Sequence, residues 1–70
     1  MYKLDLDTNK KEYITQTQKK YFEYALKWCL ENEWHSCRVN RIYYNFDFDN
    51  LKVNIVSVGG SNITYKMKEV

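Results

Sequence analysis

The side chains best suited to chemistry are concentrated in one stretch, Cys29–Cys37, with the sequence CLENEWHSC. It contains both cysteines of the chain and its single histidine, His35. Thiolates and imidazole nitrogens are the usual ligands of structural zinc, which takes four ligands in a tetrahedron. Three are present, and Glu33, one helical turn after Cys29, is a carboxylate that could complete the set. The stretch therefore has three interpretations: a zinc site, a disulfide, or the end of a helix that leads into a strand.

The third interpretation agrees best with the rest of the chain, and it assigns no metal or other cofactor. Structural zinc usually takes two closely spaced pairs of thiolate or imidazole ligands, and this chain has only three such groups. Residues 1–11 alternate polar and apolar side chains without the apolar run of a secretory signal, so we expect a cytoplasmic protein. Thiols stay reduced in that compartment, and a free cysteine such as Cys29 is commonly a small buried residue.

No catalytic group can be assigned from the sequence, and we predict that the protein is not an enzyme. A cysteine nucleophile needs an oriented base and an oxyanion donor in a cleft. A chain of 70 residues with one histidine leaves little room for them. Gly59 and Gly60 stand in a turn between two predicted strands, whereas a phosphate-binding loop joins a strand to a helix.

The N-terminal segment predicts a short β-hairpin. Residues 2–6 alternate polar and apolar side chains in the manner of a half-buried strand. Residues 7–10 contain aspartate and asparagine, which favour a turn. Residues 12–15 form the second strand if Leu4 lies opposite Ile14. The alternative is that the following helix begins early and includes residues 12–15.

A single helix is predicted from a capping box at Thr15 and Gln18 to about Glu33. This segment contains no glycine or proline and is rich in good helix formers. At about 100° per residue, a core face and a neighbouring aromatic stripe form an apolar arc wider than one sheet face requires. The core face consists of Phe22, Ala25, Leu26, Cys29 and Leu30, and the aromatic stripe of Tyr21, Tyr24 and Trp28.

The second half changes to a period of two, which predicts strands over residues 38–48 and 51–58 and a further strand after the two glycines. A two-residue loop at Asp49-Asn50 and a three-residue loop at Gly59-Gly60-Ser61 keep the apolar side chains on one face. The resulting cross-strand pairs are Tyr44 with Ile55, Phe46 with Val53, Asp47 with Lys52, Ile55 with Tyr65, and Val53 with Met67.

Together these elements predict a single small α+β domain over residues 1–70. The order ββαβββ describes a two-layer fold, in which one helix packs on one face of an antiparallel sheet. The net charge of +2 neither demands nor excludes a nucleic-acid partner, although it falls short of the strongly basic balance of a dedicated binder, and it argues against an acidic DNA mimic. The chain has no apolar run near the ~20 residues of a membrane-spanning helix.

Two surfaces are candidates for binding. Tyrosine and tryptophan are enriched in interface hot spots, so the aromatic stripe and the nearby Trp34 form a candidate surface for a partner or a homodimer, unless the helix is buried more deeply. Its residues are Tyr21, Tyr24, Trp28 and Trp34.

Basic residues interleaved with an aromatic ring can hold phosphates and stack a base. The outer sheet face, otherwise an ordinary solvated face, is therefore a candidate contact for nucleic acid or a charged partner through Arg41, Tyr43, Lys52, Lys66 and Lys68.

The function predicted from these features is a small, non-enzymatic protein that binds a larger host protein or a protein–nucleic acid complex. Lys, Asn, Ile, Tyr and Phe make up 30 of the 70 residues, which is typical of an A/T-rich genome. Small proteins of this profile are often phage or mobile-element inhibitors of host defence nucleases, so we expect a counter-defence, anti-CRISPR-like inhibitor in the host cytoplasm. That expectation comes from the profile and not from individual residues. The alternative is a nucleic-acid-binding module that uses the basic sheet face.

Overall fold

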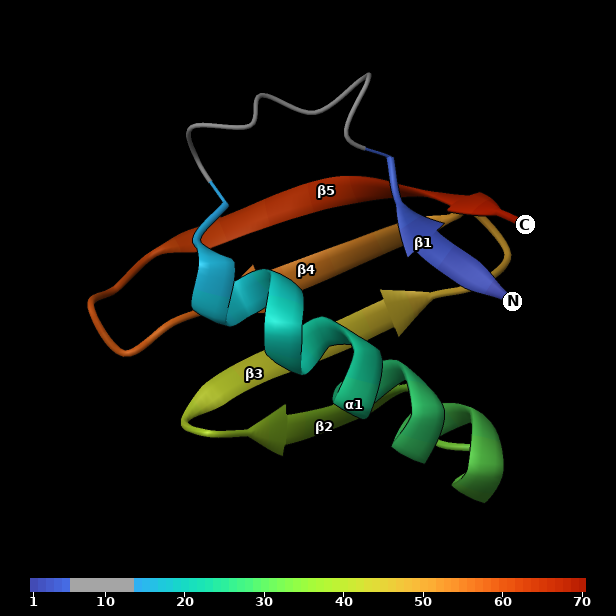
Figure 1. Ribbon diagram of the computed structural model, residues 1–70, viewed down its shortest axis with the longest axis horizontal. Coiled ribbons are helices and arrows are strands. Elements are labelled where there is room, and N and C mark those ends of the chain that lie inside the picture. The colour runs from blue at the N-terminus through green and yellow to red at the C-terminus, as the bar shows by residue number, and fades with distance from the viewer. Residues whose placement is uncertain (6–13) are drawn as a thin grey trace.

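The computed structural model describes residues 1–5 and 14–70, and in these ranges one helix lies across one face of a five-stranded antiparallel sheet (Figure 1). This confirms the predicted two-layer α+β fold. The strand order is β1-β5-β4-β3-β2, so β1 and β2 are the two edges. The elements are β1 (Tyr2–Leu4), α1 (Gln16–Asn32), β2 (Ser36–Val39), β3 (Ile42–Asp47), β4 (Lys52–Val56) and β5 (Asn62–Glu69).

The N-terminal strand pairs with the C-terminal strand and not with its neighbour in sequence. Leu4 lies opposite Met67, and the backbone N–H of Asp5 donates to the carbonyl oxygen of Lys66 at 3.0 Å. The predicted pairing of Leu4 with Ile14 is therefore wrong. Ile14 is a buried residue directly before the helix N-cap, Thr15, and the remainder of the predicted hairpin, over residues 6–13, lies outside the described residues.

The helix begins and ends where the sequence predicts. The Thr15 hydroxyl accepts the N–H of Gln18, and the Gln18 side chain accepts the N–H of Thr15, both at 3.0 Å. At the other end, Glu33 adopts the left-handed conformation with φ of 58°. This residue turns the chain, and the N–H of Trp34 then donates to the carbonyl oxygen of Cys29 at 2.9 Å.

Residues 38–48 form two strands, not the single strand that the alternating pattern predicts. A tight turn at Asn40 and Arg41, with φ of 50° and 66°, joins β2 to β3. Two successive positive φ values define the hairpin turn for which Asn-Gly is the usual sequence. The second position here is arginine, which is not a typical turn residue, so the alternation of polar and apolar residues predicted one uninterrupted strand. The observed order in the described residues is therefore βαββββ.

The register between β3 and β4 is the predicted one, with Tyr44 opposite Ile55 and Phe46 opposite Val53. The register between β4 and β5 is shifted by two residues, because Val53 lies opposite Tyr65 and Ile55 opposite Ile63. The loop is residues 58–60, since the N–H of Ser57 donates to the Ser61 carbonyl oxygen at 2.9 Å. Gly60, with φ of 88°, takes the last loop position, which requires a left-handed residue. A shift of two keeps every side chain on its predicted face.

The core lies between α1 and the inner face of the sheet. The helix contributes Phe22, Ala25, Leu26 and Cys29, and the strands contribute Leu4, Val39, Ile42, Tyr44, Phe46, Val53, Ile55, Tyr65 and Met67. Phe22 packs against the rings of both Tyr44 and Phe46, at centroid distances of 6.4 and 5.7 Å. Within the described ranges, no helix has both the length and the apolar character needed to cross a membrane.

Candidate protein-binding surface

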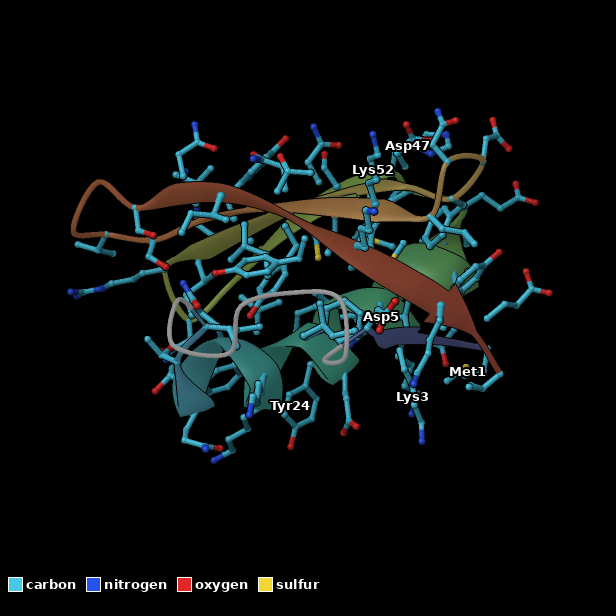
Figure 2. All side chains as sticks on the ribbon, turned by 90° about the horizontal axis from the view of Figure 1, so that it is seen from above. Met1, Lys3, Asp5, Tyr24, Asp47 and Lys52 are labelled. Atoms are coloured by element: carbon cyan, nitrogen blue, oxygen red, sulfur yellow. The ribbon has the colours of Figure 1, made fainter. Side chains whose placement is uncertain are left out.

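The aromatic stripe of the helix is divided between core and solvent. Tyr21 is half-buried and packs on the core, with its ring 5.8 Å from that of Tyr24. Tyr24 and Trp28 are 49% and 45% exposed, and Trp34 beyond the helix is 51% exposed. Figure 2 shows Tyr24 pointing away from the sheet on the helix side of the molecule. Three of the four predicted partner-binding side chains are therefore available to a partner.

Trp28 and Trp34 line one open groove between α1 and the start of β2. The groove has a volume of about 650 Å³, and its other lining residues are Asn32, Ser36, Cys37 and Arg38. The last helical turn is fixed there by the Asn32 side chain, which donates to the carbonyl oxygen of Trp28 at 2.9 Å. The left-handed turn after the helix brings Trp34 next to the groove, so the two tryptophans flank one hollow.

One wall of this groove is an edge strand with open hydrogen-bonding groups. In antiparallel pairs, residues alternate between facing the neighbouring strand and facing away from it. The N–H of Phe46 donates to the carbonyl oxygen of His35 at 2.7 Å, which sets the alternation for β2 against β3. The backbone groups of Ser36 and Arg38 therefore face away from β3. They have no hydrogen-bond partner within residues 1–5 and 14–70.

The CLENEWHSC stretch forms the helix end, the turn and the start of β2, as the preferred interpretation has it. Both thiols are free. Cys29 is buried, and its burial together with the adjacent Cys37 raises its pKa to about 12. Cys37 is half-buried and its Sγ lies 3.7 Å from the carbonyl oxygen of Ala25. Among the described residues, no three histidine, cysteine or acidic side chains are grouped as a metal ion requires.

The residues of the predicted basic face fall into separate groups on the outer side of the sheet. Figure 2 shows Asp47 and Lys52 on the side of the sheet away from α1, and Lys52 lies opposite Lys66 on β5. Arg41 and Tyr43 lie toward the other end, where they line a hollow of about 460 Å³. A neutral row of Asn45, Asn54 and Thr64 separates the two groups, and Lys68 lies opposite Lys3 at the β1 edge.

Arg38 is the residue that sequence reasoning missed. It is exposed, lies opposite Tyr43 in the sheet, and borders both the tryptophan groove and the hollow beside Arg41. The sequence placed it inside one long strand, whereas the turn at Asn40 and Arg41 makes its strand an edge. A turn signal at those two residues would have identified the edge, but arginine does not give one.

No protein-family model, curated protein or solved structure matches this chain.

Proposed function

We propose that the chain is a non-enzymatic protein-binding module, and that its binding surface is the groove formed by α1 and β2. The observation that carries the proposal is the placement of Trp28 and Trp34, each about half exposed, on the walls of one open hollow. Tryptophan is the side chain most enriched in interface hot spots. Large exposed aromatic surfaces that flank a hollow are typical of interaction sites.

The exposed ring surface is large enough to support binding. Covering the exposed half of each ring removes on the order of 100 Å² of apolar surface from water. At ~25 cal/mol per Å² this contributes about 2.5 kcal/mol for each of Trp28 and Trp34. Tyr24, 49% exposed on the same helix, extends the surface toward the helix N-terminus.

The partner we propose is a larger host protein, and the effect on it is inhibition by covering a functional surface. The supporting features are the small size of the chain and an amino-acid composition typical of an A/T-rich genome. Both are typical of phage and mobile-element inhibitors of defence nucleases. Arg38, at the rim of the groove, is placed to speed association with an acidic surface, since rim charges act mainly on the association rate.

The test is affinity capture of bacterial host proteins on the tagged chain, with and without nuclease treatment. Trp34→Ala removes a groove ring, and Tyr43→Ala, which removes an exposed ring from the outer sheet face, is the matched control. We expect proteins that are retained after nuclease treatment, lost on Trp34→Ala and kept on Tyr43→Ala. Equal capture by both variants would contradict the proposed surface.

A second candidate function is nucleic-acid binding by the outer face, and one observation favours it. The structure adds Arg38 to Arg41 and Tyr43 around a single hollow, so two arginines and one exposed aromatic residue line the same surface. Such a group can contact phosphates and stack a base. In this case captured material is lost on nuclease treatment, binding weakens steeply with salt, and Tyr43→Ala is the damaging variant.

A further inference from the structure

We propose that the partner contributes an extended peptide segment that adds to the free edge of β2 as a sixth strand. This inference rests on the proposed protein-binding function and specifies the chemistry of the partner. The segment alternates an apolar side chain, directed into the groove between α1 and β2, with an acidic side chain directed toward Arg38.

The hydrogen-bonding groups of the edge have the arrangement that strand addition needs. Ser36 and Arg38 present their backbone N–H and C=O groups away from β3, whereas the backbone groups of Cys37, between them, face β3. An added strand is recognised through such main-chain groups, and alternate side chains fill the adjoining pockets. Two open residues, separated by one, match the period of an extended peptide.

The helix provides a cover for the inward side chain of the added strand. Figure 1 shows the C-terminal part of α1 overlying the start of β2 and continuing past that edge of the sheet. The groove at this place is lined by both tryptophans, Cys37 and Asn32. A side chain that points inward from a strand next to β2 therefore meets indole rings, which favours an aliphatic or aromatic residue there.

The charge at the groove favours an acidic residue on the other face of the segment. Arg38 is exposed and forms no ion pair within the described ranges, and no lining residue of the groove is acidic. A carboxylate opposite this guanidinium can form a paired hydrogen bond with it. Because Arg38 lies on the outer face and the tryptophans on the inner side, the apolar and acidic residues must occupy alternate positions.

A second copy of the chain fits this edge less well than a peptide does. In its β2, the inward residues Cys37 and Val39 already lie under its own helix, so they offer nothing to fill the groove. The second copy also brings its own Arg38 to the edge, where an acidic side chain is favoured. We therefore assign the edge to a segment of a different protein.

The test begins with a phage-displayed library of random linear peptides, selected on the immobilised 70-residue chain and counter-selected on the Trp34→Ala variant. We expect enriched peptides to alternate apolar and acidic residues. Synthetic copies are then N-methylated one residue at a time, which leaves the protein untouched. Methylation at alternate positions should weaken binding by about ten-fold, the effect of one lost hydrogen bond. Methylation at the intervening positions should change affinity by less than about two-fold.

Two further measurements locate the peptide. The amide protons of Ser36 and Arg38 should exchange more slowly with solvent in the complex, while that of Asn45, opposite Ser36 in β3, should be unchanged. Arg38→Glu should weaken the acidic peptides, and replacing their acidic residue by lysine should restore affinity for that variant. Restoration by the charge swap shows that the loss is not caused by misfolding.

Several results would overturn strand addition. One is that no peptide is enriched over the Trp34→Ala control, and another is that N-methylation has equal effects at every position. A third is that the amide protons of Ser36 and Arg38 exchange slowly in the chain alone because a second copy occupies the edge. If binding requires Trp34 but shows no alternation on N-methylation, protein binding stands and strand addition is wrong. If captured host proteins are indifferent to Trp34, the proposed function itself is wrong.

Discussion

The hydroxyl of Tyr44, on the central part of β3, donates a hydrogen bond to the backbone carbonyl oxygen of Gln18 at 2.8 Å. Tyr44 is fully buried, and Gln18 is the one buried polar side chain among the described residues. The Gln18 side chain caps the helix at Thr15 and donates to the hydroxyl of Ser57. One connected set of polar groups therefore fixes the N-terminal end of α1 over the sheet, which in turn sets where the helix crosses β2.

Tyr44→Phe should lower the free energy of unfolding by about 1 kcal/mol, the usual net contribution of one buried hydrogen bond. The ring and its packing are kept, so the loss should stay well below that of Tyr44→Ala, at about 3–5 kcal/mol. Tyr43→Phe, at the exposed neighbouring position, is the control and should change stability by less than about 0.5 kcal/mol. Urea denaturation measures all three variants. Equal effects of Tyr44→Phe and Tyr43→Phe would show that the buried hydrogen bond contributes nothing.

Stability should fall at alkaline pH, beginning near pH 9. Burial and the neighbouring Cys37 raise the pKa of Cys29 from 9.0 to about 12, and burial raises the pKa of Tyr44 and Tyr65 above 10.0. The unfolded chain loses these protons at lower pH than the folded chain does, so rising pH favours unfolding. The contribution is intact below pH 9 and declines above it, by up to about 1.4 kcal/mol per pH unit for Cys29 alone.

The control for this pH dependence is Cys29→Ala, which removes the first group to titrate. Urea denaturation between pH 8 and 10 covers the range in which the cysteine thiol ionises in the unfolded chain. Over this range the stability of Cys29→Ala should decline less steeply than that of the parent chain. The comparison uses slopes, so any loss of packing at Cys29 does not affect it. Parallel slopes would mean that the buried thiol does not resist ionisation.

The two cysteines should differ in reactivity with iodoacetamide at neutral pH. The thiolate is the reactive form, and Cys29 is both buried and held protonated by its raised pKa. Cys37 is half-buried at the groove and should be alkylated first. Mass spectrometry of peptides at successive times gives the order. Both should react at similar rates in denaturant, and similar rates in the native chain would contradict the burial of Cys29.

Arg41→Gly should stabilise the chain by about 1 kcal/mol, because a left-handed backbone is costly for residues other than glycine. Arg41 has φ of 66° in the turn between β2 and β3. Arg38→Gly is a matched control, since it removes the same side chain from strand backbone and should be destabilising. Thermal denaturation distinguishes them. A loss of stability in both variants would indicate that the Arg41 side chain itself contributes to the fold.

The parts of the fold that were predictable from sequence depend on local chemistry. The capping box at Thr15 and Gln18 is a spacing of three residues, and the β3–β4 register follows from alternation on both sides of a short loop. Two of the wrong parts depend on distant or unusual residues. Leu4 pairs with Met67, far away in the chain, and the turn at Arg41 uses a residue that rarely adopts that conformation.

The candidate surface was predictable in its residue types but not in its arrangement. Helical spacing identified Tyr24 and Trp28 as surplus to the core, and both are exposed. Spacing could not distinguish them from Tyr21, whose packing depends on neighbouring elements. The groove itself follows from β2 being an edge strand, which is a property of the complete strand order. Ser36 and Arg38 therefore became candidates only once that order was known.

Both edges of the sheet are short, with three residues in β1 and four in β2. Long exposed edges template indefinite stacking of chains into fibrils, and short or charged edges are one way in which natural proteins prevent it. With only Ser36 and Arg38 open on β2, one guest segment uses all the hydrogen-bonding capacity of that edge. In the proposed complex, each β2 edge therefore holds one guest segment, and its short length disfavours the stacking of further chains.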